Sequence, residues 1–139
     1  MGVALHRQFP WIDFICTGES DQLFPALVQQ ISTGGKFDNL TGLIYRHNGD
    51  TETNGLHAPP VIDLDSLPFP DYDDYFEQIE ASNIEVDPDS IWLPLEASRG
   101  CWWSKCTFCG LNTGTLIFRS KSSSRVMAEI KNFPKSIRL

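Results

Sequence analysis

The first part of the chain combines a short apolar run with one amphipathic segment. Residues 11–17 (WIDFICT) are rich in Ile, Phe and Trp and stop before Gly18, which predicts a buried strand followed by a tight turn. Apolar side chains then recur at helical spacing, and Gly34-Gly35 predicts the end of that helix. We expect Pro25 in the first turn of the helix, where a missing N–H costs little. The residues at helical spacing are Leu23, Phe24, Leu27, Val28 and Ile31.

A second apolar run follows this predicted helix. Residues 42–46 (GLIYR) predict a strand, and the sequence 47–50 (HNGD) predicts a hairpin turn, because Asn-Gly favours the positive φ angles that such turns need. The order strand, helix, strand is typical of an α/β layer.

The middle of the chain changes character. Prolines and aspartates are concentrated in residues 58–75, which predicts an ordered linker without a long regular element. We expect a short helix over 73–81. Residues 91–97 (IWLPLEA) predict a further strand, with Pro94 indicating an edge or an irregularity.

The last part of the chain predicts one short strand and one helix. The strand is expected over 115–119. Ser122 or Ser123 is a suitable N-cap for the helix, since a serine hydroxyl can accept from a backbone N–H of the first turn. Its predicted buried stripe consists of Val126, Met127 and Ile130.

Composition places the chain among globular proteins. Hydrophobic residues make up 41% of the 139 residues, which is enough to form a core. No apolar run approaches the roughly 18 residues of a membrane span, and the N-terminus lacks the apolar region of a secretory signal. Four cysteines are too few for a disulfide-rich secreted scaffold. We therefore expect a soluble protein of the reducing cytoplasm.

Charge is divided unevenly along the chain. Residues 1–98 carry a net charge of −14 and residues 99–139 a net charge of +7, with Glu129 as the only acid of the second segment. The acidic body argues against nucleic-acid binding, whereas the basic segment could attract an anion. Asp71, Asp73 and Asp74 are interpreted as a solvated face of the linker rather than a second site.

Three cysteines lie in the basic segment, directly after the strand predicted over 91–97. Cys101, Cys106 and Cys109 have the spacing C-x4-C-x2-C, which lets one loop fold around a single metal centre. Three protein ligands leave one coordination position open, for a substrate or cofactor at an iron–sulfur cluster or for water or a fourth residue at zinc. The neighbouring Arg99 and Lys105 offset the negative charge of a thiolate-bound centre.

The spacing by itself leaves alternatives open. A zinc site could use the same three cysteines with Cys16, His47 or His57 as a distant fourth ligand. Disulfides are the less favoured alternative, because the chain lacks secretory features.

Several stretches taken together resemble a known family. The chain resembles the radical S-adenosylmethionine enzymes, and among them the cobalamin-binding branch associated with maturation of ribosomally made peptides. The matching stretches cover nearly the whole chain in order; they are ALHRQFPWIDFICTGESD, FPALVQQI, GLIYR, LDSLPFPDYDDYFEQIEAS, LPLEASRGCWWSKCTFCGLN and FRSKSSSRVMAEI. The first cysteine gap is one residue longer than the C-x3-C-x2-C of most members.

The resemblance implies roles for particular residues. Cys101, Cys106 and Cys109 would bind a [4Fe-4S] cluster through three of its irons, and the remaining iron would chelate S-adenosylmethionine. Phe108 occupies the aromatic position that in the family lies against the adenine. In the cobalamin branch a methyl group passes through methylcobalamin to an unactivated carbon, which requires radical chemistry. The cobalt-ligating histidine motif of the family is absent here, and the implied substrate is a peptide.

The resemblance also implies an α/β fold in three parts. Residues 1–57 would be the C-terminal part of a Rossmann-like cobalamin-binding domain, 58–90 a linker with a short helix, and 91–139 the first βα unit of a partial TIM barrel. Because a complete barrel of this kind needs on the order of 200 residues, we expect a central fragment of a longer enzyme that is inactive alone, with a second chain as one way to complete the barrel. A zinc-binding interaction module and an inactive remnant are the alternatives.

Overall fold

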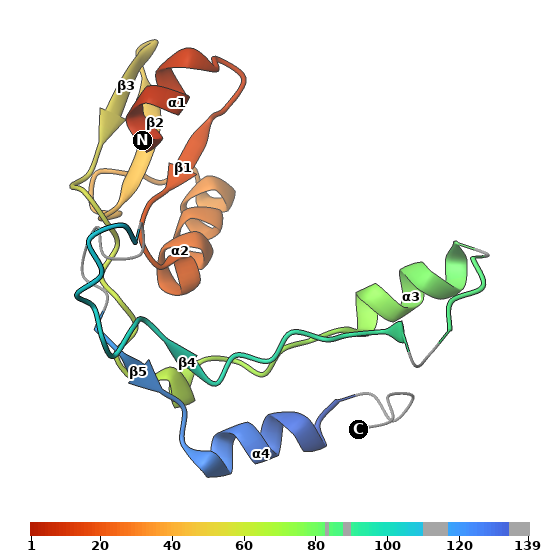
Figure 1. Ribbon diagram of the computed structural model, residues 1–139. Coiled ribbons are helices and arrows are strands. Elements are labelled where there is room, and N and C mark those ends of the chain that lie inside the picture. Colours follow the sequence, from red (N-terminus) through yellow and green to blue (C-terminus); the bar gives the residue numbers. More distant parts are fainter. Residues whose placement is uncertain (83, 88–89, 110–116, 134–139) are drawn as a thin grey trace. The chain divides into compact units, whose positions relative to one another are not determined.

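The structure is a computed structural model that describes residues 1–82, 84–87, 90–109 and 117–133 (Figure 1). The chain forms two compact units, Met1–Ile62 and Asp63–Leu139. Both contain helices and short strands, so the fold is mixed α/β. No helix in the described ranges is long and apolar enough to cross a membrane.

The first unit is built on a small antiparallel sheet. Its strands are β1 (Phe14–Cys16), β2 (Leu43–His47) and β3 (Asp50–Thr53), and β2 lies in the middle. The predicted hairpin is confirmed: His47 pairs with Asp50, and Asn48 and Gly49 have φ angles of 51° and 90°. This pair of positive angles is the geometry of a two-residue hairpin turn that follows the strand twist.

Helices cover the sheet on both faces. Phe14, Cys16, Leu43 and Tyr45 lie on one face, where they pack with Leu23 and Leu27 of α2 (Ser20–Thr33), with Phe37 and with Leu40. On the other face, Ile15 and Ile44 lie beside the first residue of α1 (Gly2–Gln8). Figure 1 shows both helices beside the sheet. The first unit therefore has three layers around a largely apolar core.

The helix α1, which the hydrophobic pattern did not predict, is attached by a buried histidine. The His6 side chain is fully buried, with Nε2 at 3.0 Å from the Asp13 carbonyl oxygen and Nδ1 at 3.0 Å from the Thr51 hydroxyl. A carbonyl only accepts, so Nε2 donates; in the neutral ring Nδ1 then accepts from Thr51. These bonds connect α1 to Asp13, which directly precedes β1, and to Thr51 in β3.

The predicted helix over 23–31 is confirmed as α2, and so is its end. Gly34 caps it with a left-handed φ of 66°. The expectation for Pro25 was wrong: α2 begins at Ser20, so Pro25 is the sixth helical residue and lies beyond the first turn. The helix begins earlier than the apolar spacing indicated because polar Ser20, Asp21 and Gln22 form its first turn without contributing to the apolar pattern.

The second unit contains shorter elements. They are the 3₁₀ turn η1 (Leu64–Ser66), α3 (Asp73–Ala81), the two-residue strands β4 (Ser98–Arg99) and β5 (Arg119–Ser120), and α4 (Ser123–Lys131). β4 and β5 pair antiparallel. The predicted helix over 73–81 is confirmed as α3.

The strand predicted over 91–97 was wrong. No strand is formed there, and β4 begins only at Ser98. Pro94 has no N–H to donate to a ladder, and its carbonyl instead accepts from the Tyr72 hydroxyl. The strand predicted over 115–119 falls partly outside the described residues; within them, β5 begins at Arg119.

The predicted helix start in α4 is confirmed, but the predicted buried stripe was wrong in part. The Ser122 hydroxyl accepts from the Arg125 backbone N–H, as an N-cap should. Val126 and Ile130 are half-buried, whereas Met127 is 51% exposed. The residue of α4 that is fully buried is Glu129. The most deeply buried side chain of this helix is therefore a charged one, with polar partners.

The Rossmann-like and barrel assignments stay predictions. The strands within the described ranges are few and antiparallel, and none closes into a barrel. The chain's own division falls after Ile62, within the segment predicted to be a linker.

Candidate functional site

The loop that carries the three cysteines is closed at its base by β4 and β5. Arg99 pairs with Arg119, and the Lys121 N–H donates to the Ala97 carbonyl at 2.9 Å. Next to this pair, Gly100 has a φ of 85°, and a Cβ there would lie only 2.6 Å from the Ile117 carbonyl oxygen. A side chain at position 100 would therefore separate the two ends of the loop. We call β4, β5 and this Gly100–Ile117 contact the stem.

Cys101, Cys106 and Cys109 are half-buried and none forms a disulfide. The Ser104 N–H lies 3.5 Å from the Cys101 sulfur, to which it donates, and Ser104 itself has a positive φ of 46°. Backbone donors of this kind stabilise thiolates and tune thiolate-bound clusters. One short loop thus presents three half-buried thiols, none of them in a disulfide.

The chemistry of this donor set fits an iron–sulfur cluster, because three thiolates on one loop are typical cluster ligands. Within the described ranges, which include all three cysteines, no three His, Cys, Asp or Glu side chains are grouped closely enough to hold a metal. Binding would have to draw the sulfurs together. Cys16, His47 and His57, the candidates for a fourth zinc ligand, belong to the first unit, and the zinc site also stays a prediction.

Exposed aromatic side chains lie beside the cysteines in the sequence. Phe108 is 90% exposed and Trp102 is 76% exposed. The Trp102 and Trp103 rings meet edge to face at 5.6 Å, and the Lys105 ammonium lies 5.7 Å from the Trp103 ring centre. Phe108 is therefore available to stack against a planar ligand, although its role toward adenine stays a prediction.

An ionic cluster lies directly after the stem. The Glu129 carboxylate is fully buried and accepts from the Lys121 ammonium at 2.8 Å to each oxygen and from Arg125 Nε at 2.8 Å. Arg125 also donates to the Asp65 and Leu67 carbonyl oxygens, at 3.1 Å and 2.5 Å. We call Glu129, Lys121 and Arg125 the ionic cluster. It connects α4 to the segment around η1.

Two carboxyl pKa values are lowered in this region. Burial alone would raise the pKa of Glu129, but the hydrogen bonds and charges of Lys121 and Arg125 outweigh it, and the net shift is downward. The pKa of Asp65 is lowered chiefly by hydrogen bonds from Ser122, whose N–H donates to Asp65 Oδ1 at 2.8 Å. Both groups therefore favour their charged form.

Sequence reasoning missed the ionic cluster, although one signal was present. Glu129 is the only acid after residue 98, and it follows Arg125 by four residues, the spacing of neighbours on one helix face. The basic segment is also less available to an external anion than expected. Among its described cations, Lys121 and Arg125 are bound to Glu129, Arg99 to Glu96 at 2.6 Å, and Arg119 to the Ile117 carbonyl at 2.9 Å.

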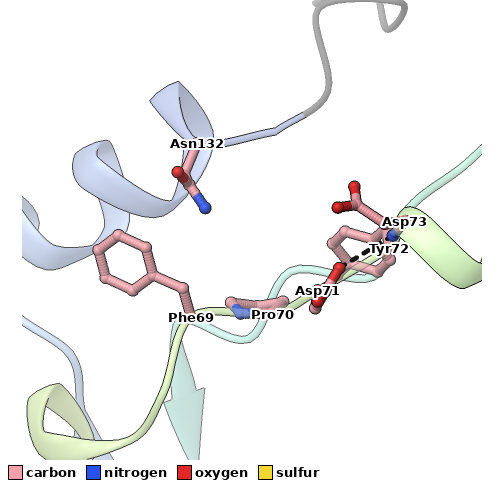
Figure 2. A pocket seen from close by; sticks show the side chains of 6 residues that line it. All are labelled: Phe69, Pro70, Asp71, Tyr72, Asp73 and Asn132. Carbon is pink, nitrogen blue, oxygen red and sulfur yellow. Dashed lines mark hydrogen bonds between the residues drawn. The ribbon is translucent and has the colours of Figure 1, made fainter.

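A pocket of about 390 Å³ lies between the linker and the C-terminal end of α4 (Figure 2). Of the residues that line it, Asp71 accepts at Oδ1 from the Asp73 N–H at 2.9 Å, so this carboxylate is already hydrogen-bonded within the local turn. Asp71, Asp73 and Asp74 are exposed, as predicted for a solvated linker face. The pocket is lined by Phe69, Pro70, Asp71, Tyr72, Asp73 and Asn132.

Tyr72 supports the linker beside this pocket. Its ring meets Phe133 edge to face at 5.6 Å. Burial, reinforced by the nearby Glu129 charge, raises the pKa of its hydroxyl, so Tyr72 remains a neutral donor to the Pro94 carbonyl.

Comparison with known proteins found one curated relative. The chain is 31% identical over 126 residues to a protein of Pyrococcus horikoshii named as an uncharacterized methyltransferase. The match covers 89% of this chain and 26% of that protein, so the chain spans about a quarter of the relative's length. No protein-family model matches the chain, and no solved structure matches it significantly. The similarity points to a methyltransferase-like protein.

Proposed function

We propose that this chain is the cluster-binding segment of an S-adenosylmethionine-dependent radical methyltransferase. The observation that carries the proposal is one loop on a closed stem that presents three half-buried cysteines, none of them in a disulfide. The similarity to a protein named as a methyltransferase supports it independently. Cobalamin, a ribosomally made peptide as substrate, and a second chain that completes the barrel belong to the same proposal and rest on the family resemblance.

The residues present would divide the work. Cys101, Cys106 and Cys109 would hold the cluster, and the Ser104 N–H would keep donating to the Cys101 sulfur. When bound, such a cluster supplies the electron that cleaves S-adenosylmethionine and so makes unactivated C–H bonds reactive. Phe108, whose ring faces solvent, would stack on the adenine. Lys105 would place one positive charge beside a thiolate-rich centre.

Anaerobic reconstitution with iron and sulfide tests the proposal. We expect about four irons per chain, visible charge-transfer absorbance, and a paramagnetic resonance signal after reduction that changes when S-adenosylmethionine is added. Cys106→Ala should abolish the cluster. Cys16→Ala, which removes a free thiol of the first unit, should leave it intact. Binding of zinc alone, or equal iron loss in both variants, would overturn the proposal.

A further inference from the structure

We infer that Glu129 is a positioning residue: by binding Lys121 and Arg125, its buried carboxylate holds the stem of the cysteine loop in one arrangement. The functional consequence of this inference rests on the function proposed above. The structural inference itself concerns residues that touch no cofactor and that lie outside the cysteine loop.

The connection from Glu129 to the cysteines is short. Lys121 follows β5 directly, and its backbone N–H extends the stem by donating to the Ala97 carbonyl at 2.9 Å. Its side-chain ammonium donates to both Glu129 oxygens at 2.8 Å. At the opposite side of the stem, Arg99 precedes Cys101 by only two residues. A shift of Lys121 would therefore reach the first cysteine through the two residue pairs of β4 and β5.

The other side of the cluster is anchored to the segment around η1. Arg125 bonds Glu129 and also the Asp65 and Leu67 carbonyls, while its guanidinium lies 4.0 Å from the centre of the Phe69 ring. The Ser122 N–H, one residue beyond Lys121, donates to Asp65 Oδ1. Glu129 is therefore the point at which the stem, α4 and the η1 segment meet.

The energetics favour a positioning role over a purely stabilising one. Removing charges from water costs several kcal/mol per ion, and apolar side chains of similar volume often stabilise a fold as well as a buried ion pair does. Hydrogen bonds at fixed distances define one relative position, which apolar contacts do not. The side chains of Lys121 and Glu129 are 3% and 0% exposed, so no water competes for these bonds.

The experiment compares thiol reactivity in the metal-free chain. The alkylation rates of Cys101, Cys106 and Cys109 are measured by mass spectrometry, with Cys16 of the first unit as the internal reference. We expect Glu129→Gln to raise the three rates about fivefold relative to Cys16, since loosening the stem populates open loop conformations. Glu80→Gln, at an exposed position of α3, is the matched control and should change none of them.

A second variant separates positioning from folding. Lys121→Met and Arg125→Met combined with Glu129→Leu remove all three charges of the ionic cluster and keep the apolar volume, so the second unit should remain folded by circular dichroism. We expect the loop cysteines of this folded variant to react faster as well, and the resonance signal of a reconstituted cluster to broaden. Wild-type rates and an unchanged signal in the folded triple variant would overturn the inference.

The two proposals fail in different ways. If the wild-type chain binds no iron, the proposed function fails, while the alkylation rates still decide whether Glu129 positions the loop. If iron binds equally well in every variant and the thiols react at wild-type rates, the function stands and the positioning role is wrong.

Discussion

The two units of this chain have different kinds of core. In the first unit, whose residues are all described, the buried residues are mostly apolar, and His6 is the buried polar exception. In the second unit the only apolar residue buried to the same degree, among those described, is Leu64, whereas Arg119, Lys121 and Glu129 are all buried. The buried apolar residues of the first unit are Leu23, Leu27, Leu40, Leu43, Ile44, Tyr45, Ala58 and Val61.

This difference between the two cores predicts how substitutions should change the stability of each unit. Apolar burial is non-directional and roughly proportional to area, so we expect the stability of the first unit to follow the apolar area that it buries. A buried ion cluster requires every partner at its place, because one missing charge leaves the others without compensation. The region beside the cysteine loop is therefore positioned by directional contacts, while the first unit is stabilised by area.

Removing the Glu129 charge should produce the largest effect. Glu129→Ala leaves Lys121 and Arg125 buried without their carboxylate, and we expect a loss of about 3–5 kcal/mol in the stability of the second unit. Glu96→Gln, which removes the partly exposed partner of Arg99, should cost no more than about 1 kcal/mol. Urea denaturation followed by site-resolved hydrogen exchange measures the loss of stability in each variant. Equal losses in the two variants would contradict the distinction between the buried and the partly exposed ion pair.

Truncating the apolar core should affect the first unit by a somewhat smaller amount. Leu43 lies in the central strand β2 and is fully buried in the core, and Leu43→Ala should cost about 3 kcal/mol through lost burial and a residual cavity. Leu56→Ala, at a position that is 84% exposed, should stay within about 0.5 kcal/mol. Hydrogen exchange should accelerate over residues 1–62 only; faster exchange in the α4 region would show that the two cores are not independent.

Two glycines of the first unit test how much the close approach of two backbone segments contributes to its stability. Gly42 and Gly49 both have a φ of 90°, but a Cβ on Gly42 would lie 2.3 Å from the Ala58 backbone nitrogen, whereas a Cβ on Gly49 meets nothing within 4 Å. Gly49→Ala therefore measures backbone strain alone, about 1 kcal/mol. Gly42→Ala adds a clash between backbones and should cost about 2 kcal/mol or more. Similar melting temperatures for the two variants would show that the close approach to Ala58 is unimportant.

Acid should loosen the second unit gradually. The pKa of Glu129 is lowered from its ordinary value of 4.5, so its contribution to stability is fully present above pH 4.5 and is lost as pH falls through the lowered value. Asp65, lowered from 3.8, acts in the same direction at lower pH. Hydrogen exchange of α4 measured from pH 6 downward should show the loss first near pH 4, and Glu129→Gln should remove most of it. A pH-independent α4 would contradict this assignment.

Local chemistry explains the elements that could be predicted. The Asn48-Gly49 turn, the Gly34 cap of α2 and the Ser122 cap of α4 each depend on φ angles or hydrogen bonds within a few residues, and all three are confirmed. The three cysteines were identified in the same way, because their spacing lies within one loop. Their role as cluster ligands stays a prediction.

Distant partners explain what could not be predicted. The apolar pattern of residues 91–97 favoured a strand, but a strand needs a neighbour to satisfy its backbone groups, and the carbonyl of Pro94 pairs instead with a tyrosine hydroxyl. Likewise, Met127 was expected inside, and the apolar pattern gave no sign that Glu129 would be buried, because hydropathy is assigned to each residue alone. The two cations that make the burial of Glu129 possible lie four and eight residues before it.

The sequence by itself determined the local conformations: where the hairpin turns, where α2 ends and α4 begins, and that three thiols share one loop. The tertiary structure decided which of the resulting surfaces are buried. It placed His6 between one carbonyl and one hydroxyl group, and Glu129 between two cations. The physical reason is that backbone dihedral preferences act between neighbours, whereas the cost of burying a polar group depends on partners that only the folded chain brings near.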